Sequence, residues 1–361
     1  MSYQLILTVF DIICFMSASI NIEDFDYTLP EELIAQHPPK IRGTSRLLVL
    51  DRSSGEITHR SYGDIADYLQ SGDVVVLNNT KVIKARLAAQ NVMGKTRELF
   101  LIEKHGHDFG IHKHKVLYRG KIHAGEILRI DGFELIVSEV MVGGLAIISG
   151  EVDLLKLSEK YGSVPLPPYM KRDASKEDTE RYQTVFAKDP GSVAAPTASL
   201  NFTKDLEQKL KTKGVKIAYL TLHVGLGTFL PIRVDDVTKH KMHSEYFEIP
   251  KETVQAIQSA KKSGNKVLAI GTTVTRTLEY CAPQILSQKP QDLSGEADIF
   301  IYPGYEFKII DHLVTNFHAP RTTVLMLTAT FASWPHLKHT YDTAAAEKYA
   351  FLSYGDSMLI T

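Results

Sequence analysis

The hydrophobic pattern of this 361-residue chain changes near residue 154, and that change limits the possible fold more than any other feature. Between Asp73 and Asp153 the apolar residues come in short runs, rich in β-branched side chains and separated by turns that contain glycine. The runs are Val74 to Leu77, Leu99 to Glu103, Lys115 to Tyr118, Glu126 to Ile130, Glu134 to Val140 and Leu145 to Glu151. Short runs at hairpin spacing, with hardly any helical pattern between them, predict a small antiparallel β-barrel or sandwich.

From about Leu154 onward, helical and strand patterns alternate. Thr203 to Lys213 has the spacing of an amphipathic helix, with Thr203 as its N-cap and Gly214 at its end. The segments that follow are a strand at Val215 to Leu222, a helix at Lys251 to Ser263, a strand at Lys266 to Ile270 and a helix at Val274 to Cys281. This alternation predicts an α/β sheet with helices on its faces.

Length and pattern together predict two domains. We expect residues 73–153 to form an inserted small antiparallel β-barrel domain within an α/β domain, which is made of residues 16–72 and 154–361. The predicted fold class is therefore α/β, with a separate all-β insertion.

An apolar stretch near the N-terminus, Leu5 to Met16, looks like the core of a signal peptide. No Lys or Arg precedes it, Asp11 interrupts it, and it is too short to cross a bilayer as a helix. We therefore expect translation to begin at Met16, with residues 1–15 as an extension outside the native chain. The alternative is a short apolar helix or strand that lies on the fold.

Charge and cysteine content exclude several classes of protein. The 41 Lys and Arg residues balance 42 Asp and Glu residues, which excludes a uniformly basic coat for nucleic acid but leaves room for a local basic patch. Cys14 and Cys281 lie far apart, so a disulfide framework and a cysteine-based zinc site are excluded. Without a secretion signal or membrane segment, the expected location is the cytoplasm.

The turn Gly271-Thr272-Thr273 follows a predicted strand and precedes a predicted helix, where α/β proteins usually bind their ligands. Arg276 lies one helical turn further on and offers a cation to the same place, and Glu279 shares its helix face. The alternative is a structural turn with a surface ion pair. A second turn, His223 to Phe229, lacks the G-x-G-x-x-G spacing of a dinucleotide site.

Two groups among the 14 histidines resemble metal sites. The first lies in a predicted hairpin of the β module and consists of His105, His107, His112, His114 and His123. Zinc binding is one interpretation, but we favour a solvated, weakly basic rim, which can also meet RNA phosphates. The second group is His240, His243 and Glu245, where acid/base chemistry is favoured over metal ligation and a structural histidine is the alternative.

Familiar hydrolase motifs are absent from the sequence: there is no G-x-S-x-G elbow, no P-loop and no H-E-x-x-H helix. The residues alone therefore predict only a cytoplasmic α/β enzyme with an inserted β module.

Long, unusual strings give a sharper indication. They include DFDYTLP from Asp24, VLNNTKVIKARL from Val76, YGSVPLPPY from Tyr161, RYQTVFA from Arg181, GSVAAPTASLNFT from Gly191, and then LHVGLGTF, HKMHSEYF, IFIYPGYEFK, LVTNFHAP and SYGDSMLI. In this colinear order, from about Asp24 to the C-terminus, the chain resembles the S-adenosylmethionine:tRNA ribosyltransferase-isomerase family of queuosine biosynthesis.

This resemblance implies an enzyme that transfers and isomerises the ribosyl group of S-adenosylmethionine onto 7-aminomethyl-7-deazaguanine at the wobble position of tRNA. The product is epoxyqueuosine in tRNA, and adenine and methionine are released. The resemblance also implies an α/β domain with a separate β-barrel, S-adenosylmethionine as co-substrate, no prosthetic group and no metal. We expect a monomer that binds tRNA and no membrane.

The reaction requires a base of tuned pKa, an acid for the departing adenine and a site that keeps the attacking amine unprotonated. The candidate catalytic residues are the titratable groups inside the motif strings: His223, His243, Glu245, His318 and Asp356. The candidate substrate-binding residues are the aromatic Tyr302, Tyr305, Phe317 and Tyr354, the polar Asn78, Asn79, Lys81 and Arg86, and the turn residues Gly271, Thr272, Thr273 and Arg276. Each aromatic residue has the core as its alternative.

Some positions depart from the family pattern. Asn201 stands where a histidine is usual, Lys84 replaces a usual proline, and Ala319 replaces a usual leucine. Asn201 is the one specific indication for an alternative function, a catalytically impaired tRNA-binding homologue. A metal-binding protein that uses the histidine-rich hairpin is a third hypothesis.

Overall fold

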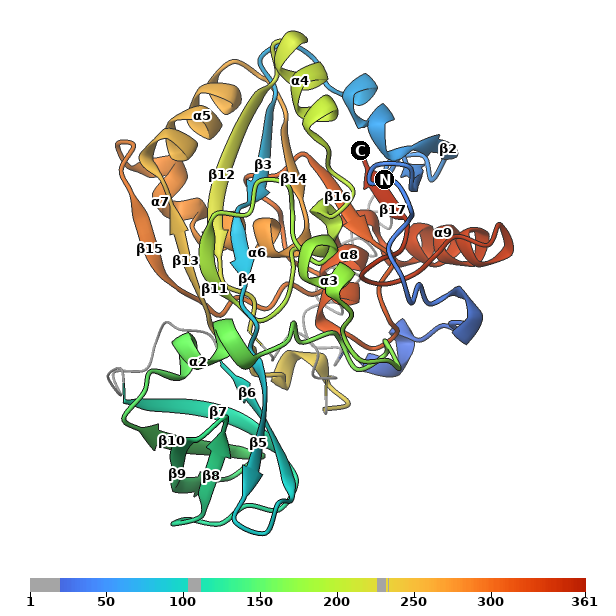
Figure 1. The fold of residues 1–361 in the computed structure, drawn as a ribbon. Helices are drawn as coiled ribbons and strands as arrows, with labels where there is room; N and C mark the ends of the chain where they lie inside the picture. The colour runs from blue at the N-terminus through green and yellow to red at the C-terminus, as the bar shows by residue number, and fades with distance from the viewer. Residues whose placement is uncertain (1–19, 103–111, 226–231, 233) are drawn as a thin grey trace, which may run out of the picture.

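A computed structural model describes residues 20–102, 112–225, 232 and 234–361 (Figure 1). The expectation that the native chain begins at Met16 lies outside these residues.

A nine-stranded sheet forms the larger part of the molecule (Figure 1). Its order is β15 (Leu293–Ala297), β13 (Glu245–Ile249), β12 (Lys216–Leu222), β3 (Val74–Asn78), β14 (Val267–Ile270), β16 (His312–Asn316), β17 (Ser357–Ile360), β1 (Arg46–Leu50) and β2 (Ile57–Ser61). The four strands β12, β3, β14 and β16 run parallel to one another. Their carboxyl ends therefore meet at one edge of the sheet.

Two helical layers cover the faces of this sheet. Alternate residues of β3, Val74 and Val76, pack in one core with the helices α5 (Lys251–Lys262), α6 (Thr272–Tyr280), α7 (Ala282–Ser287), α8 (Thr323–Ala332) and α9 (Trp334–Ala346). Val75 and Leu77 pack in the other core with η3 (Tyr62–Tyr68) and α4 (Lys204–Thr212). All of β3 is buried because both of its faces are covered, which explains the unbroken apolar run from Val74 to Leu77.

The smaller part is a closed antiparallel barrel that lies apart from the sheet (Figure 1). Its strands are β5 (Arg86–Asn91), β6 (Thr96–Leu101), β7 (Lys113–Arg119), β8 (Ile127–Ile130), β9 (Phe133–Met141) and β10 (Leu145–Gly150). Inward residues such as Leu87, Leu99 and Val137 fill it as a separate core.

Short elements join the two parts. The chain leaves β3 through β4 (Thr80–Val82), which pairs with β11 (Asp189–Ser192), and it returns from the barrel through α2 (Leu154–Tyr161) and α3 (Lys176–Arg181). In the part of the chain that the structure describes, the remaining short helices are η1 (Ile22–Phe25), η2 (Glu31–Leu33), η4 (Thr197–Ser199) and η6 (Val237–Lys239).

The predicted fold class is confirmed: an α/β sheet carries a small antiparallel β-barrel. Thr203 caps α4 as expected, since its side chain accepts a hydrogen bond from the Leu206 N–H. The placement of Val74 to Leu77 in the β module, and with it the boundary at Asp73, is wrong, because this run is the central strand β3 of the large sheet. The true first strand of the barrel, β5, was not predicted, because its inward positions include Ala89 and Asn91 and give a weak apolar pattern.

Within the described part of the chain, no helix combines the length and apolar character that crossing a membrane requires.

Candidate active site

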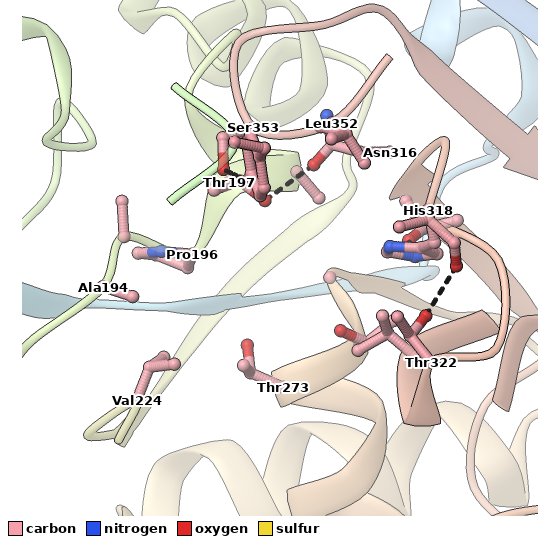
Figure 2. A pocket seen from close by; sticks show the side chains of 18 of the residues that line it. Ala194, Pro196, Thr197, Val224, Thr273, Asn316, His318, Thr322, Leu352 and Ser353 are labelled. Atoms are coloured by element: carbon pink, nitrogen blue, oxygen red, sulfur yellow. Dashed lines mark hydrogen bonds between the residues drawn. The ribbon is translucent and has the colours of Figure 1, made fainter. Parts of the chain in front are cut away.

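A cavity of about 310 Å³ lies at the carboxyl ends of the parallel strands β14 and β16, where open α/β sheets place their ligands. Figure 2 shows the side chains that surround it. They come from η4 and the loop before it, from the turn after β12, from the first turns of α6 and α8, from the end of β16 and the segment after it, and from the loop before β17. Further side chains come from the segments on either side of α3. The members used below are Tyr169, Tyr182, Thr197, Val224, Gly271, Thr272, Thr273, Thr315, Asn316, His318, Thr322 and Ser353.

The predicted turn Gly271-Thr272-Thr273 forms one wall of the cavity. Gly271 has a φ of 104°, a left-handed conformation that favours glycine, and it turns the chain from β14 directly into α6. The Gly271 N–H donates to the Val314 carbonyl of the neighbouring strand at 2.8 Å. This bond holds the start of α6 against β16.

His318 lies on the cavity wall just after β16 (Figure 2). Its Nε2 is 2.7 Å from Oγ1 of Thr315, its backbone N–H donates to the Tyr341 hydroxyl at 2.9 Å, and its carbonyl accepts a hydrogen bond from the Tyr27 hydroxyl. Burial lowers the pKa of His318 to about 3, because the charged imidazolium is desolvated. The cavity therefore presents a neutral imidazole at physiological pH.

Neutral polar groups make up the rest of the cavity's polar surface. Thr197 donates to Oδ1 of Asn316 at 2.8 Å, and the hydroxyl groups of Tyr169 and Ser353 are hydrogen bonded to each other (Figure 2). The candidate list missed these four residues, although they lie inside or beside the strings that carry the family resemblance.

The buried Glu245 and Arg276 and the partly buried His243 form a cluster that is not part of the cavity wall. Oε1 of Glu245 accepts the Gly225 N–H at 3.0 Å and lies 3.4 Å from Nε2 of His243, while Oε2 pairs with the Arg276 guanidinium. Burial opposes ionisation of Glu245, but Arg276 and His243 outweigh it, and the pKa falls to about 2. The carboxylate therefore stays charged, and it ties the turn that follows Val224 to helix α6.

The alternative of a surface ion pair at this turn is wrong, because Arg276 is buried. Its guanidinium also donates to the carbonyls of Ile299 and Ala297, each at 3.3 Å. Glu279 is buried too, and it accepts the backbone N–H groups of Lys308, Ile309 and Ile310.

His223 is buried behind the cavity and does not line it. Its Nδ1 is 2.8 Å from Oγ1 of Thr80, and its ring stacks on Tyr246 with 6.1 Å between centroids. A Cβ on Gly191 would lie 2.7 Å from this ring, so the ring packs against a bare backbone. These contacts indicate that His223 joins β4 and β11 to the end of β12.

Asp356 is also removed from the cavity, and its carboxylate accepts the Arg46 N–H at 2.7 Å and the Ala350 N–H at 2.8 Å. Burial raises the pKa of Asp356, and these backbone hydrogen bonds partly offset that effect. The carboxylate holds the loop from which Ser353 reaches the cavity. Its contacts are those of a structural group.

The four predicted aromatic contacts lie outside the cavity wall. Phe317 is in the core, 4.9 Å from Phe351 between centroids, and Tyr302 packs against Phe300. The hydroxyl groups of Tyr305 and Tyr354 donate to Glu279 and Asp178 at 3.1 and 2.7 Å. The aromatic side chains on the wall are Tyr169 and Tyr182 instead.

The four candidates near the barrel follow the connection from the sheet to the barrel and do not form one cluster. Asn78 is buried and donates to the Leu222 carbonyl at 2.9 Å and to Thr273 Oγ1 at 3.4 Å. Asn79 donates to Asp189 at 3.1 Å. Lys81 is exposed on β4, and Arg86 pairs with Glu98 and Asp173 at the start of the barrel. Of these four, Asn78 reaches a cavity residue.

Two further expectations concern Asn201 and metal binding. Asn201 is buried and donates to the Gly355 carbonyl at 3.4 Å, so it supports the loop before β17. Among the residues that the structure describes, no group of three or more His, Cys, Asp or Glu side chains is arranged to hold a metal ion. His105 and His107 of the predicted hairpin group lie outside the described residues.

Comparison with known proteins identifies relatives over almost the whole chain. The family model described as queuosine biosynthesis protein matches residues 22–360. A relative from Chlorobium chlorochromatii, named S-adenosylmethionine:tRNA ribosyltransferase-isomerase, is 54% identical over 344 residues, which cover 94% of this chain and 100% of the relative. A relative of the same name from Francisella tularensis subsp. novicida is 45% identical, with 94% and 100% covered.

A solved structure gives the same result. The crystal structure of S-adenosylmethionine tRNA ribosyltransferase from Thermotoga maritima is 36% identical and has a TM-score of 0.54. The match covers 94% of this chain and 100% of that chain. Sequence and fold agree, and the chain belongs to the queuosine biosynthesis protein family.

Proposed function

We propose that this protein is an S-adenosylmethionine:tRNA ribosyltransferase-isomerase. It transfers and isomerises the ribosyl group of S-adenosylmethionine onto 7-aminomethyl-7-deazaguanine at the wobble position of tRNA. The full-length relatives that carry this name support the proposal. The structural observation that carries it is the cavity at the carboxyl ends of β14 and β16, with the neutral imidazole of His318 on its wall.

The chemistry of the cavity suits the proposed reaction. The sulfonium of S-adenosylmethionine acidifies the neighbouring 5′ carbon, so a base removes a proton there and adenine leaves. The substrate amine then attacks the sugar, and methionine leaves as the epoxide closes. We assign proton acceptance to His318, because it carries the one imidazole among the described residues that line the cavity, and burial keeps this imidazole neutral. The hydroxyl and amide groups around it are suited to orient uncharged parts of the substrates.

Several residues receive supporting roles in this proposal. Glu245 and Arg276 hold the turn after β12 against α6, while Asp356 holds the loop that carries Ser353. Thr272 and Thr273 contact substrate at the start of α6. We further propose that the enzyme works as a cytoplasmic monomer without a prosthetic group, an expectation that rests on the family resemblance.

The test is product formation. Purified protein is incubated with S-adenosylmethionine and a tRNA that carries 7-aminomethyl-7-deazaguanine, and adenine, methionine and the modified nucleoside are followed by mass spectrometry. The proposal predicts all three products, in equal amounts, and none with a tRNA that lacks the precursor base. Binding of the tRNA without any product would instead favour the catalytically impaired homologue.

A further inference from the structure

The peptide that carries His318 is held from three directions. The Tyr27 hydroxyl donates to its carbonyl, its N–H donates to the Tyr341 hydroxyl at 2.9 Å, and Thr315 Oγ1 lies 2.7 Å from its ring Nε2. Tyr27 lies just after η1 near the N-terminus, and Tyr341 lies on α9. Segments about 290 residues apart in sequence thus meet at one residue of the cavity wall.

The two tyrosines are themselves fixed by packing. Their rings meet edge to face, with 5.1 Å between centroids, and Phe317 packs against Tyr341 at 5.5 Å. Tyr341 is fully buried, and Phe351 completes the cluster against Tyr27. A buried tyrosine hydroxyl normally finds a hydrogen-bond partner, and here both hydroxyl groups engage the backbone of one residue. The aromatic cluster therefore provides a rigid support behind His318.

We propose that the hydroxyl groups of Tyr27, Tyr341 and Thr315 are positioning groups that fix the imidazole of His318 against the cavity. This inference rests on the function proposed above. The two tyrosines fix the backbone on both sides of the Cα atom, and Thr315 fixes the rotation of the ring. No residue of the three transfers a proton to substrate.

The contact between Thr315 and His318 also affects which nitrogen of the imidazole carries the proton. When Nε2 donates to Thr315, the lone pair of Nδ1 is left to accept a proton. In the described part of the chain, no hydrogen-bond partner lies at Nδ1 of His318. Thr315 is buried on β16 and lines the same cavity, so the ring is held by the strand that carries it to the site.

The first experiment removes the tyrosine hydroxyl groups without removing their rings. Tyr27→Phe, Tyr341→Phe and the double variant are compared with Tyr349→Phe, whose hydroxyl bonds to His59 and whose ring packs on the same Phe317. We expect the double variant to lower kcat on the order of 100-fold, the scale of a small misplacement of a catalytic group, with KM for tRNA near its wild-type value. A fall in kcat no greater than that of Tyr349→Phe would overturn the proposal.

The second experiment tests the ring contact. Thr315→Val keeps the shape of the side chain but removes the hydroxyl, and Thr315→Ser restores it. The valine variant should lower kcat and change its pH profile, and the serine variant should recover the wild-type profile. Equal profiles for valine and serine would contradict the role of the hydroxyl.

A third measurement does not depend on turnover. Nitrogen-15 NMR of the histidine rings reports which nitrogen carries the proton, and the His318 signals are assigned by their loss in His318→Asn. We expect the Nε2-protonated form in the wild type and a mixture of tautomers in Thr315→Val. If the tautomer of His318 is unchanged in Thr315→Val, the positioning role is refuted, even if the wild type proves inactive. If the tautomer changes but the wild type shows no turnover, only the proposed function is refuted.

Discussion

The cavity edge of the large sheet and the surface of the barrel differ in how they use polar and apolar residues. At the cavity, the buried polar groups Asn316 and Asn78 are paired with partners from distant segments, and Thr315 is paired with the nearby His318. The core of the barrel is largely apolar, although Asn91 is buried there and donates a hydrogen bond to Glu126. The strands and hairpins of the barrel expose apolar side chains that include Val92, Met93, Ile136 and Val142. No residue of β5 to β10 is among those that line the cavity.

This difference assigns separate tasks to the two parts. Paired buried polar groups specify one arrangement of the cavity wall, and breaking them leaves unsatisfied groups at a cost of about 1–3 kcal/mol each. Exposed side chains on a β-barrel tolerate substitution, and changes there usually stay within about 0.5 kcal/mol. We therefore expect substitutions in the sheet domain to change chemistry or folding, and substitutions on the barrel surface to change the encounter with tRNA at most.

The largest effect is expected for His318→Asn. Loss of a general base lowers rates by roughly 10²- to 10⁴-fold, and the asparagine is small enough to fit the same wall. Steady-state turnover with S-adenosylmethionine and precursor tRNA measures this, and tRNA affinity by filter binding should stay close to that of the wild type. A barrel variant with a larger loss of kcat would break the separation of tasks.

A large loss of stability is expected for Glu245→Ala. This change leaves the Arg276 guanidinium buried without its partner, which typically costs about 3–5 kcal/mol. The matched control is Glu134→Ala on the barrel, which removes the exposed ion pair with Arg129 and should cost under about 1 kcal/mol. Urea unfolding of both variants measures the contrast, and equal losses would contradict it.

A smaller effect is expected on tRNA binding when the basic rim of the barrel is reversed in charge. Lys113 and Arg119 are exposed at the two ends of β7. Their double replacement by Glu should raise KM for tRNA and flatten its dependence on salt, since each phosphate contact contributes a slope of about 0.9. The value of kcat should stay near that of the wild type. An unchanged salt dependence would remove the barrel from the tRNA interface.

The smallest effect on turnover is expected from pH. Because the pKa of His318 is lowered to about 3, the group binds no proton in the folded enzyme near pH 6.5, and kcat/KM should show no ionisation of an ordinary histidine there. The unfolded chain does bind this proton, so His318 should weaken folding as pH falls from its unfolded pKa toward 3. His318→Asn should therefore make unfolding by urea less dependent on pH in that range. A steeper dependence of urea unfolding on pH in His318→Asn would contradict the neutral state of His318 in the folded enzyme.

Sequence alone predicts those elements whose signals are local. Helix α4 was found because Thr203 and Gly214 mark its ends. Strand β3 was misplaced because a buried parallel strand and a barrel strand both appear as a short apolar run, and only pairing with β12 and β14 distinguishes them. Strand β5, which closes the barrel, is not predicted for a different reason, because its inward positions include Ala89 and Asn91 and give a weak apolar pattern.

The site shows the same limit more clearly. His318 and the Gly271 turn were identified, whereas Thr197 and Ser353 were not, because hydroxyl groups on loops carry no chemical signature until the fold brings them together. Phe317 and His318 are neighbours in sequence, yet the first belongs to the aromatic core and the second to the cavity. The orientation of these two residues depends on the packing of Tyr341, which lies 23 residues after His318 and accepts a hydrogen bond from its backbone N–H.

The central claim is that the cavity around His318 is where the ribosyl group is transferred. It is tested most directly by single-turnover release of adenine from S-adenosylmethionine, with enzyme in excess over precursor tRNA, in wild type and His318→Asn. The account predicts release that depends on the precursor tRNA in the wild type, and a rate lower by at least about 100-fold in the variant while the tRNA stays bound. Release at the wild-type rate by His318→Asn would contradict it.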